Sequence, residues 1–128
     1  MDKPLLDSDV IIWYLRGREH ARQWVNDLKK GGVPCCSVLS VTEIVIGMRP
    51  KEANVTRAFL EALDIVPVDR AIAWRSGELI QRYARRGVTL DFVDATIAAT
   101  CLMRQLALAT YNTDHYPMTG LQKAPMPS

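Results

Sequence analysis

Five acidic residues occupy positions from which they could gather around a metal ion. Asp94 lies inside the apolar segment Phe92–Ala99, and Asp7 lies between Leu5–Leu6 and the apolar Val10–Ile12. A buried carboxylate is costly unless it is paired or bound to a metal, and neighbouring carboxylates repel one another. A divalent cation removes both penalties, and a ligand set of oxygen atoms alone favours Mg²⁺ or Mn²⁺ over Zn²⁺. The five candidates are Asp7, Glu43, Asp91, Asp94 and Asp114.

Carboxylates that hold Mg²⁺ commonly serve to hydrolyse phosphodiester bonds. One ion activates a water molecule as the nucleophile, and a second can stabilise the leaving oxygen. This chemistry needs neither a Ser-His-Asp triad nor a glycine-rich phosphate loop, and the sequence contains neither G-x-x-x-x-G-K-[ST] nor G-x-G-x-x-G. Of the two histidines, His20 lies at a polar helix start and is expected to be exposed. The acids therefore predict a metal-dependent phosphodiesterase.

Each acid, taken singly, also fits a structural role at the start of a helix. Ser40 and Glu43 have the spacing of a capping box, Asp91 could cap the helix that contains Asp94, and Asp7 could cap its own helix. The helix dipole favours an acid there by a few tenths to about 1 kcal/mol. Both interpretations stay open for each acid, whereas the set of five is harder to explain by capping alone.

The elements that must position these acids alternate between strand and helix. Strands are predicted at residues 5–6, 33–38, 65–68 and 106–110, and helices at 8–15, 19–30, 40–48, 52–63, 70–86 and 92–104. This order predicts an α/β domain with a mainly parallel sheet flanked by helices on both faces. Pro67 places the third strand near an edge. Right-handed crossovers bring the helix starts to the carboxyl edge of the sheet, where all five acids would lie.

Length and composition predict one domain over residues 1–128, with a tail loosely held from about residue 123. A chain of 128 residues can fold without a metal, so a bound metal would be functional. The apolar run Val10–Leu15 is far short of the roughly 20 residues that span a membrane. No secretory signal is visible, and Cys35, Cys36 and Cys101 suit buried thiols rather than disulfides. We therefore expect a cytoplasmic protein without a membrane segment.

Four motifs along the chain resemble one known family. They are Leu5-Leu6-Asp7-Ser8-Asp9-Val10-Ile11-Ile12, Thr42-Glu43-Ile44 with Gly47, Asp94-Ala95-Thr96-Ile97-Ala98-Ala99-Thr100, and Ala109-Thr110-Tyr111-Asn112. In this order they are similar to the PIN-domain ribonucleases, and most of all to the VapC-type toxins of toxin–antitoxin pairs. The likeness spans about residues 3 to 120 and predicts a PIN-like fold.

The resemblance implies an endoribonuclease that depends on Mg²⁺, with Mn²⁺ able to substitute. Asp7 and Asp94 would bind the metal directly, and Glu43 would bind metal or position water. Ser8 matches a hydroxyl that helps to hold the acidic centre, and a helix-start hydroxyl is the alternative. Asn112 matches the family's asparagine after the last strand, and a turn-forming asparagine is the alternative.

The sequence departs from the family pattern at one place. Many relatives carry a fourth acid three residues after that asparagine, followed by phenylalanine, whereas this chain has His115-Tyr116. Asp114 comes one residue earlier. Either Asp114 takes the place of the fourth acid, or the site uses three acids together with Asp91.

The resemblance also implies partners, namely RNA, a cognate antitoxin and a second copy in a homodimer. Basic residues could contact RNA phosphates around the acids, and solvated helix ends are the alternative. In the family, a groove beside the early helices receives the C-terminal segment of the antitoxin. Core packing is the competing explanation for the apolar residues there, and we favour it for Trp24. The basic set is Arg16, Arg18, Arg22, Arg49, Lys51, Arg82, Arg85 and Arg86, and the apolar set is Trp13, Tyr14, Trp24 and residues 59–63.

Two other functions compete with the nuclease. Asp7 and Asp9 have the spacing of the nucleophile and general acid of haloacid-dehalogenase-like phosphatases, but the late acidic pair and the intervening lysine of that fold are missing. A PIN-like module that acts only through protein contacts would have the same fold without the chemistry. Loss of Asp7 or Asp94 would mark such a module, and both are present.

Overall fold

A four-stranded parallel sheet forms the centre of the computed structural model, which describes residues 2–127. The strands are β1 (Pro4–Leu6), β2 (Cys35–Ser37), β3 (Asp64–Val66) and β4 (Ala107–Ala109), in the order β3-β2-β1-β4. Leu5 pairs with Cys35 on one side and with Leu108 on the other. The parallel sheet and the edge position of β3 confirm the predictions.

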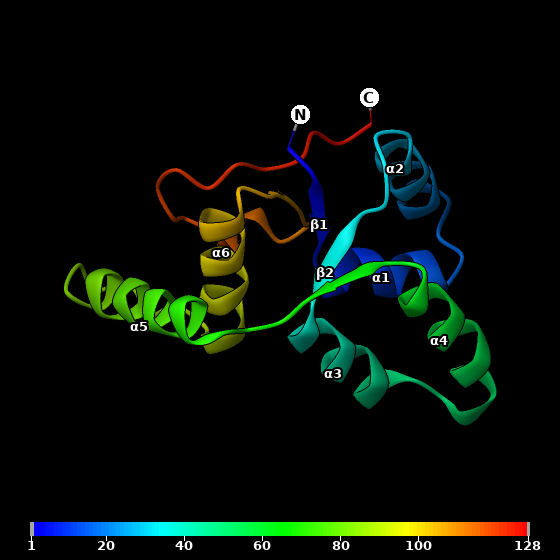
Figure 1. The fold of residues 1–128 in the computed structure, drawn as a ribbon, viewed down its shortest axis with the longest axis horizontal. Helices are drawn as coiled ribbons and strands as arrows, with labels where there is room; N and C mark the ends of the chain where they lie inside the picture. The colour runs from blue at the N-terminus through cyan, green and yellow to red at the C-terminus, as the bar shows by residue number, and fades with distance from the viewer. Residues whose placement is uncertain (1, 128) are drawn as a thin grey trace.

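Six helices cover the two faces of this sheet. They are α1 (Ser8–Leu15), α2 (Glu19–Lys29), α3 (Val38–Gly47), α4 (Ala53–Glu61), α5 (Arg70–Ala84) and α6 (Phe92–Arg104). Figure 1 shows α5 and α6 on one side of the strands and α1 to α4 on the other. The predicted flanking of both faces is therefore confirmed.

The helix that carries Glu43 begins earlier than its sequence suggests. Ser37 is its N-cap, and the Ser37 side chain accepts a hydrogen bond from the Leu39 amide at 3.1 Å. Ser40 is fully buried inside the helix, so the capping box predicted for Ser40 and Glu43 is wrong. Because Val38 already belongs to α3, Glu43 lies in its second turn rather than its first.

Two further boundaries differ from those predicted. The helix predicted over 52–63 is a short 3₁₀ turn at Pro50–Glu52 followed by α4, because Pro50 starts the turn before Glu52. Strands β2, β3 and β4 are also shorter than predicted and hold three residues each. Apolar residues on either side of such a strand are buried as well, so hydrophobicity predicts a longer segment. Only the central residues form the hydrogen bonds that define the strand.

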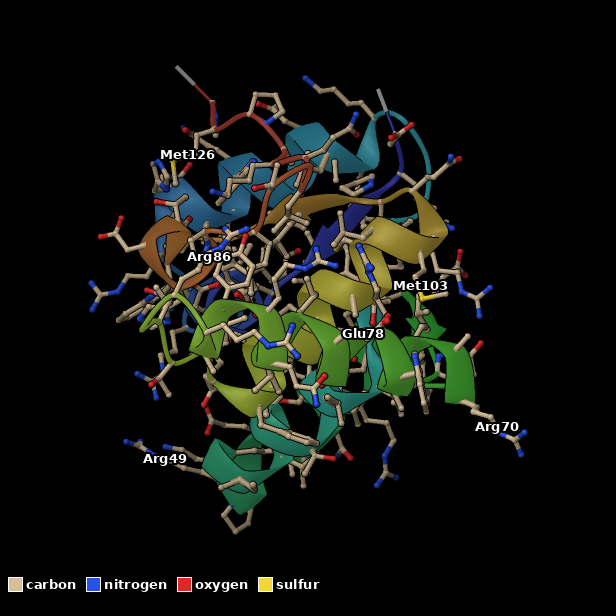
Figure 2. The ribbon with its side chains drawn as sticks, turned by 90° about the vertical axis from the view of Figure 1, so that its left-hand side faces the viewer. Arg49, Arg70, Glu78, Arg86, Met103 and Met126 are labelled. Carbon is tan, nitrogen blue, oxygen red and sulfur yellow. The ribbon has the colours of Figure 1, made fainter. Side chains whose placement is uncertain are left out.

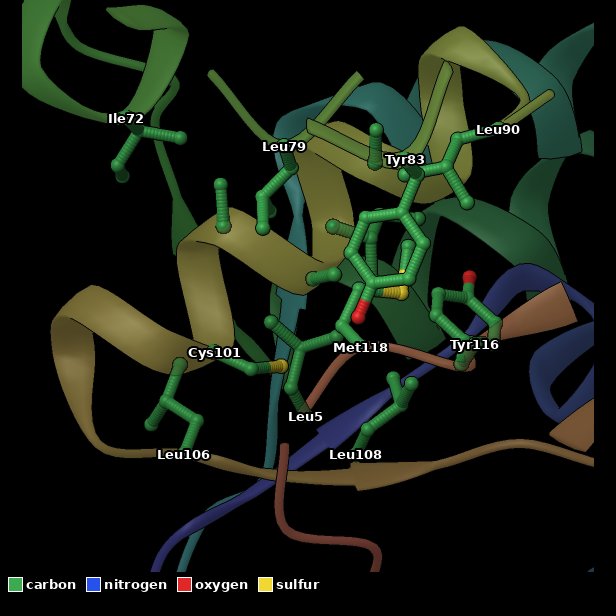
Figure 3. Close-up of a cluster of buried hydrophobic side chains, with 14 of the residues drawn as sticks. Leu5, Ile72, Leu79, Tyr83, Leu90, Cys101, Leu106, Leu108, Tyr116 and Met118 are labelled. Atoms are coloured by element: carbon green, nitrogen blue, oxygen red, sulfur yellow. The ribbon is translucent and has the colours of Figure 1, made fainter. Parts of the chain in front are cut away.

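Strand residues alternate between two hydrophobic cores, one on each face of the sheet. Leu5, Cys35 and Leu108 pack with α5 and α6 in what we call the α5–α6 core, part of which Figure 3 shows. Leu6, Cys36, Ala107 and Ala109 face the other way, into the α1–α4 core. This core contains Trp24, which is 1% exposed, so its predicted packing role is confirmed.

The C-terminal segment is tied to the sheet beyond the point where the sequence predicts a loose tail. The Leu108 amide donates to the Gln122 carbonyl at 2.9 Å, and the Ala124 amide donates to the Leu108 carbonyl at 2.8 Å. The Trp24 indole donates to the Pro125 carbonyl at 3.0 Å. The chain is therefore held in place as far as Pro125. Within residues 2–127, no helix has both the length and the apolar character needed to cross a bilayer.

Candidate active site

Asp7 stands at the carboxyl end of β1, where four neighbouring residues fix it. Its amide donates to the Ala109 carbonyl at 2.9 Å, which ties the residue to β4. Its Oδ1 accepts a hydrogen bond from the Ser8 amide at 2.9 Å, so the predicted capping of α1 is confirmed. Its Oδ2 accepts from the Thr110 hydroxyl at 2.8 Å and from the Tyr116 hydroxyl at 2.9 Å. The carboxylate is nearly buried and held in one orientation.

Asp94 reaches the same place from the first turn of α6. Its Oδ1 lies 3.2 Å from the Tyr116 hydroxyl, which also contacts Asp7. Its Oδ2 lies 3.4 Å from Nδ1 of His115, an ion pair when the imidazole is protonated. Burial, and next the charge of Asp91, raise the pKa of Asp94 above its ordinary value. Two acids far apart in the sequence therefore converge on one hydroxyl group.

Glu43 joins this centre through Ser8. The Ser8 hydroxyl donates to Oε1 of Glu43 at 2.6 Å, and Ser8 directly follows Asp7. A hydrogen bond to a carboxylate of this length is among the stronger kinds. Ser8 is therefore more than a helix-start hydroxyl, because it fixes the side chain of the third acid.

The remaining predicted residues are Asp91, Asp114 and Asn112. Asp91 caps α6 by accepting hydrogen bonds from the Val93 amide at 3.0 Å and the Asp94 amide at 3.1 Å. Asp91, Asp94, Asp114 and His115 line a cavity of about 350 Å³, which neither Asp7 nor Glu43 lines. Asp114 and Asn112 are exposed to solvent. The Asn112 amide donates to the Thr110 hydroxyl at 3.0 Å, as in a local turn.

Asp9, the second acid of the Asp7-Ser8-Asp9 motif, ties α1 to the end of β4. Its Oδ1 accepts from the Val10 amide at 2.7 Å, and its Oδ2 accepts from the Tyr111 amide at 3.0 Å. Burial, with the charge of Asp7 adding to it, raises the pKa of Asp9 to about 6. Oδ2 also lies 3.5 Å from the Thr110 hydroxyl, so both oxygens of Asp9 already accept hydrogen bonds within the protein.

The motif analysis missed two members of the site, Thr110 and Tyr116. Tyr116 is packed in the α5–α6 core and is 1% exposed. Its hydroxyl nevertheless lies between Asp7 and Asp94. The available signal was the tyrosine itself, because a phenylalanine would fill a core position without introducing a polar atom that needs a partner.

The donor set suits a hard divalent cation. Asp7 and Asp94 converge, Glu43 lies beyond the Ser8 hydroxyl, and all the donors are oxygen atoms. Among residues 2–127, no three acid, histidine or cysteine side chains are already close enough to surround an ion. Mg²⁺ in proteins commonly uses one or two carboxylates and keeps several water ligands. The two converging carboxylates therefore fit such an ion.

A second cavity of about 470 Å³ opens between α1, α3 and α4. Its apolar lining includes Ile12, Leu15 and Ile44, and its polar lining includes Arg16 and Arg49. The predicted basic residues are exposed, and Figure 2 shows Arg49 and Arg70 projecting away from the body of the molecule. The surface thus combines exposed cationic side chains with an apolar groove between α1, α3 and α4.

Comparison with known proteins adds a family to this geometry. Residues 5–120 match the model described as "PIN domain". The chain is 38% identical to "Ribonuclease VapC10" of Mycobacterium tuberculosis over 94% of its own length and 91% of that protein. It is 27% identical to "Ribonuclease VapC1" of Methanocaldococcus jannaschii over 89% of its length and 79% of that protein.

Solved structures show the same architecture. A toxin–antitoxin complex from Klebsiella pneumoniae contains a chain with a TM-score of 0.78 and 28% identity, covering 92% of this chain and 93% of that one. DNA-bound VapBC from Salmonella typhimurium has a TM-score of 0.83 at 24% identity, covering 97% of this chain and 98% of that one, and bears on the fold alone.

Proposed function

The chain belongs to the PIN domain family, and from that premise we propose that it is an endoribonuclease, the toxin of a toxin–antitoxin pair. The observation that carries the proposal is the convergence of Asp7 and Asp94 on one hydroxyl at the carboxyl edge of the sheet. These acids come from motifs far apart in a chain that matches the family from residue 5 to residue 120. The relatives named as ribonucleases, and one named as a tRNA(fMet)-specific endonuclease, support RNA as the substrate.

Asp7 and Asp94 would hold Mg²⁺ or Mn²⁺, and Glu43 would complete the site or orient the attacking water. When bound, such an ion lowers the pKa of water and stabilises charge on the leaving oxygen. Ser8 keeps Glu43 in place through the hydrogen bond of 2.6 Å. Asp7, fixed by its neighbours, needs little reordering to act as a ligand.

The less central acids have distinct roles in this proposal. Asp91 positions Asp94 by capping the helix that carries it. Asp114 lines the same cavity as Asp94 and is the candidate for the fourth acid. Asn112 shapes the turn after β4 and lies at the exposed rim, where a polar side chain can contact RNA.

The same proposal includes protein partners and a cytoplasmic location, where RNA is accessible. The groove between α1, α3 and α4 offers apolar side chains and two arginines to an antitoxin segment. The similar chain from Klebsiella pneumoniae was solved in a toxin–antitoxin complex, which supports such a partner. Val45 and Ile46, which are consecutive on α3, are 49% and 80% exposed. Exposed apolar side chains of this size support contact with a second copy.

The test is cleavage of a mixed pool of structured RNAs by antitoxin-free protein, with Mg²⁺, with Mn²⁺ and with chelator. Wild-type protein should cut only with metal. Asp94→Asn should lower the rate by two to three orders of magnitude, the size of effect seen when one electrostatic group is removed from an active site. Asp27→Asn is the matched control, because it removes the same charge from an exposed position on α2 that lines neither the acidic cavity nor the groove. Asp114→Asn, measured alongside, tests the candidate for the fourth acid.

The competing function is a PIN-like module that binds partners without chemistry. It predicts that the folded wild-type protein cuts no RNA and that Asp94→Asn binds the antitoxin as tightly as wild type. Cleavage that persists in chelator would also contradict the proposal. An Asp114→Asn loss as large as that of Asp94→Asn would instead assign Asp114 to the metal.

A further inference from the structure

Tyr116 brings a single hydroxyl into contact with both central acids. Its oxygen lies 2.9 Å from Oδ2 of Asp7 and 3.2 Å from Oδ1 of Asp94. The ring itself belongs to the α5–α6 core, where Figure 3 shows it among buried side chains that include Leu5 and Leu108. The hydroxyl is thus the polar end of a side chain whose body is packed in the core.

The backbone around Tyr116 is fixed as firmly as its ring. The Tyr116 amide donates to the Thr113 carbonyl at 3.0 Å. The hydroxyl of Tyr83 then donates to the Pro117 carbonyl at 3.2 Å and accepts from the Thr119 amide at 3.0 Å. A tyrosine has only two side-chain torsions, and packing settles both. The Tyr116 hydroxyl is therefore held in one position.

Two carboxylates that converge in a poorly solvated site repel each other and would turn apart if nothing held them. A shared hydroxyl proton offsets part of that repulsion and fixes which oxygen of each acid points inward. Oδ2 of Asp7 already accepts from both Thr110 and Tyr116. Within the described part of the chain, Oδ1 of Asp7 accepts a hydrogen bond from the Ser8 amide alone. It therefore keeps a lone pair that can bind a cation.

We propose that Tyr116 is a positioning residue that holds the Asp7 and Asp94 carboxylates in the orientation in which they bind a divalent cation. The inference rests on the proposed metal-dependent function. It differs from a purely structural role, because a residue that only fills the core would affect folding and leave metal affinity unchanged. Tyr116 instead lowers the cost of arranging the ligands before the ion arrives.

The experiment compares Tyr116→Phe with Tyr83→Phe, using Mn²⁺ binding by calorimetry in the absence of RNA. Both variants keep the aromatic ring in the same core and lose one buried hydroxyl, but only the Tyr116 hydroxyl contacts the acids. Tyr116→Phe should raise the Kd for Mn²⁺ about 3- to 10-fold, which matches the loss of one hydrogen bond. Tyr83→Phe loses its hydrogen bonds to residues 117 and 119 but keeps the bond of the Tyr116 amide to Thr113 and the packing of the Tyr116 ring. It should therefore bind Mn²⁺ as wild type does, even where its thermal midpoint falls.

Two further measurements separate positioning from packing. In wild type and Tyr83→Phe, Mn²⁺ should produce a tyrosine signal in the near-ultraviolet difference spectrum, and Tyr116→Phe should lose it. RNA cleavage by Tyr116→Phe should recover toward the wild-type rate as the metal concentration rises, because the defect lies in metal affinity.

The outcomes distinguish this inference from the function on which it rests. Equal Mn²⁺ affinity in wild type and Tyr116→Phe, together with loss of binding in Asp94→Asn, would overturn the positioning role and leave the metal site intact. Equal weakening in Tyr83→Phe and Tyr116→Phe would also overturn it, since general loosening of the core would then explain both. A wild-type protein that binds no Mn²⁺ would overturn the inference and the proposed metal site together.

Discussion

The two faces of the sheet differ in how β4 packs against the helices. In the α5–α6 core β4 supplies the large side chain of Leu108, and α6 supplies small ones such as Ala98. In the α1–α4 core β4 supplies Ala107 and Ala109, while α2 supplies the indole of Trp24 and other large groups. Small residues on a helix let its backbone lie close to the sheet, whereas small residues on a strand leave room for a bulky helix face.

This difference assigns different tasks to the two faces. Helices α5 and α6 are also joined by a hydrogen bond of 2.9 Å between the hydroxyls of Ser76 and Thr96. This side of the sheet holds Asp94 at a defined position beside Asp7. The α1–α4 side contains the apolar groove and the exposed Ile46. The α5–α6 side therefore holds Asp94 in place, whereas the α1–α4 side carries Glu43 and the groove proposed for a partner.

The largest expected effect comes from removing the bulky group of the α1–α4 core. Trp24→Ala should lower the free energy of unfolding by about 3–5 kcal/mol, because it empties a buried site that β4 alanines cannot fill. Urea denaturation with a constant slope would measure it. Trp74→Ala is the control, since a side chain 74% exposed should change stability by less than about 0.5 kcal/mol. A Trp24→Ala loss below 1 kcal/mol would mean that this face is loosely packed.

The second prediction concerns the close packing of α6 against the sheet, on the opposite face. Ala98 on α6 is fully buried, and Ala98→Leu should destabilise the protein by about 1–3 kcal/mol through overpacking. The variant should also displace α6 and with it Asp94, so RNA cleavage should fall more than stability alone explains. Ala84→Leu, at an exposed position at the end of α5, provides the matched control. Unchanged stability in Ala98→Leu would contradict close helix–sheet packing.

Periodicity of apolar residues was enough to predict the architecture, because burial on one face of each helix is a local property of the sequence. For α6, which is apolar on most sides rather than on one face, the predicted boundaries at Phe92 and Arg104 match the structure. The start of α3 was missed because Ser37 and Ser40 are chemically equal candidates for the cap. The choice between them depends on where β2 ends.

The acids of the site could be predicted, whereas the groups that join them could not. Asp7 and Asp94 are recognisable because a carboxylate in an apolar segment demands an explanation. Tyr116 is apolar enough to pass for an ordinary core residue, and its bond to Asp7 spans 109 positions of the sequence. A hydrogen bond between such distant residues depends on tertiary packing, which leaves no local pattern.

A smaller effect tests where α3 begins. Replacing each of two serines by alanine should change the stability of the protein in opposite directions. The Ser40 hydroxyl is buried, and within the described structure it has no hydrogen-bond partner. Ser40→Ala should therefore stabilise the protein by about 1 kcal/mol, since it removes an unsatisfied polar group inside a helix. Ser37→Ala should destabilise it by about 1 kcal/mol through loss of the cap. Thermal denaturation of the two variants would detect a reversal of these signs, which would restore Ser40 as the cap.

The smallest expected effect at neutral pH concerns two adjacent thiols, one in each hydrophobic core. Cys35 lies in the α5–α6 core and Cys36 in the α1–α4 core. Burial raises the pKa of Cys35 to about 11 and that of Cys36 to about 12, from an ordinary value of 9.0. Since the folded state keeps both thiols protonated, their contribution to stability is intact below pH 9 and is lost as the pH rises through these higher values.

Both thiols should therefore resist alkylation in the native protein at pH 8 and react only when the chain opens. If the two cores unfold together, Cys35 and Cys36 should be labelled at the same rate, and both rates should fall in the Ser40→Ala variant. Mass spectrometry of the labelled peptide, which holds both residues, would follow singly and doubly modified species over time. Accumulation of a form labelled only at Cys36 would show that the α1–α4 face opens alone, as a surface adapted to receive a partner can do.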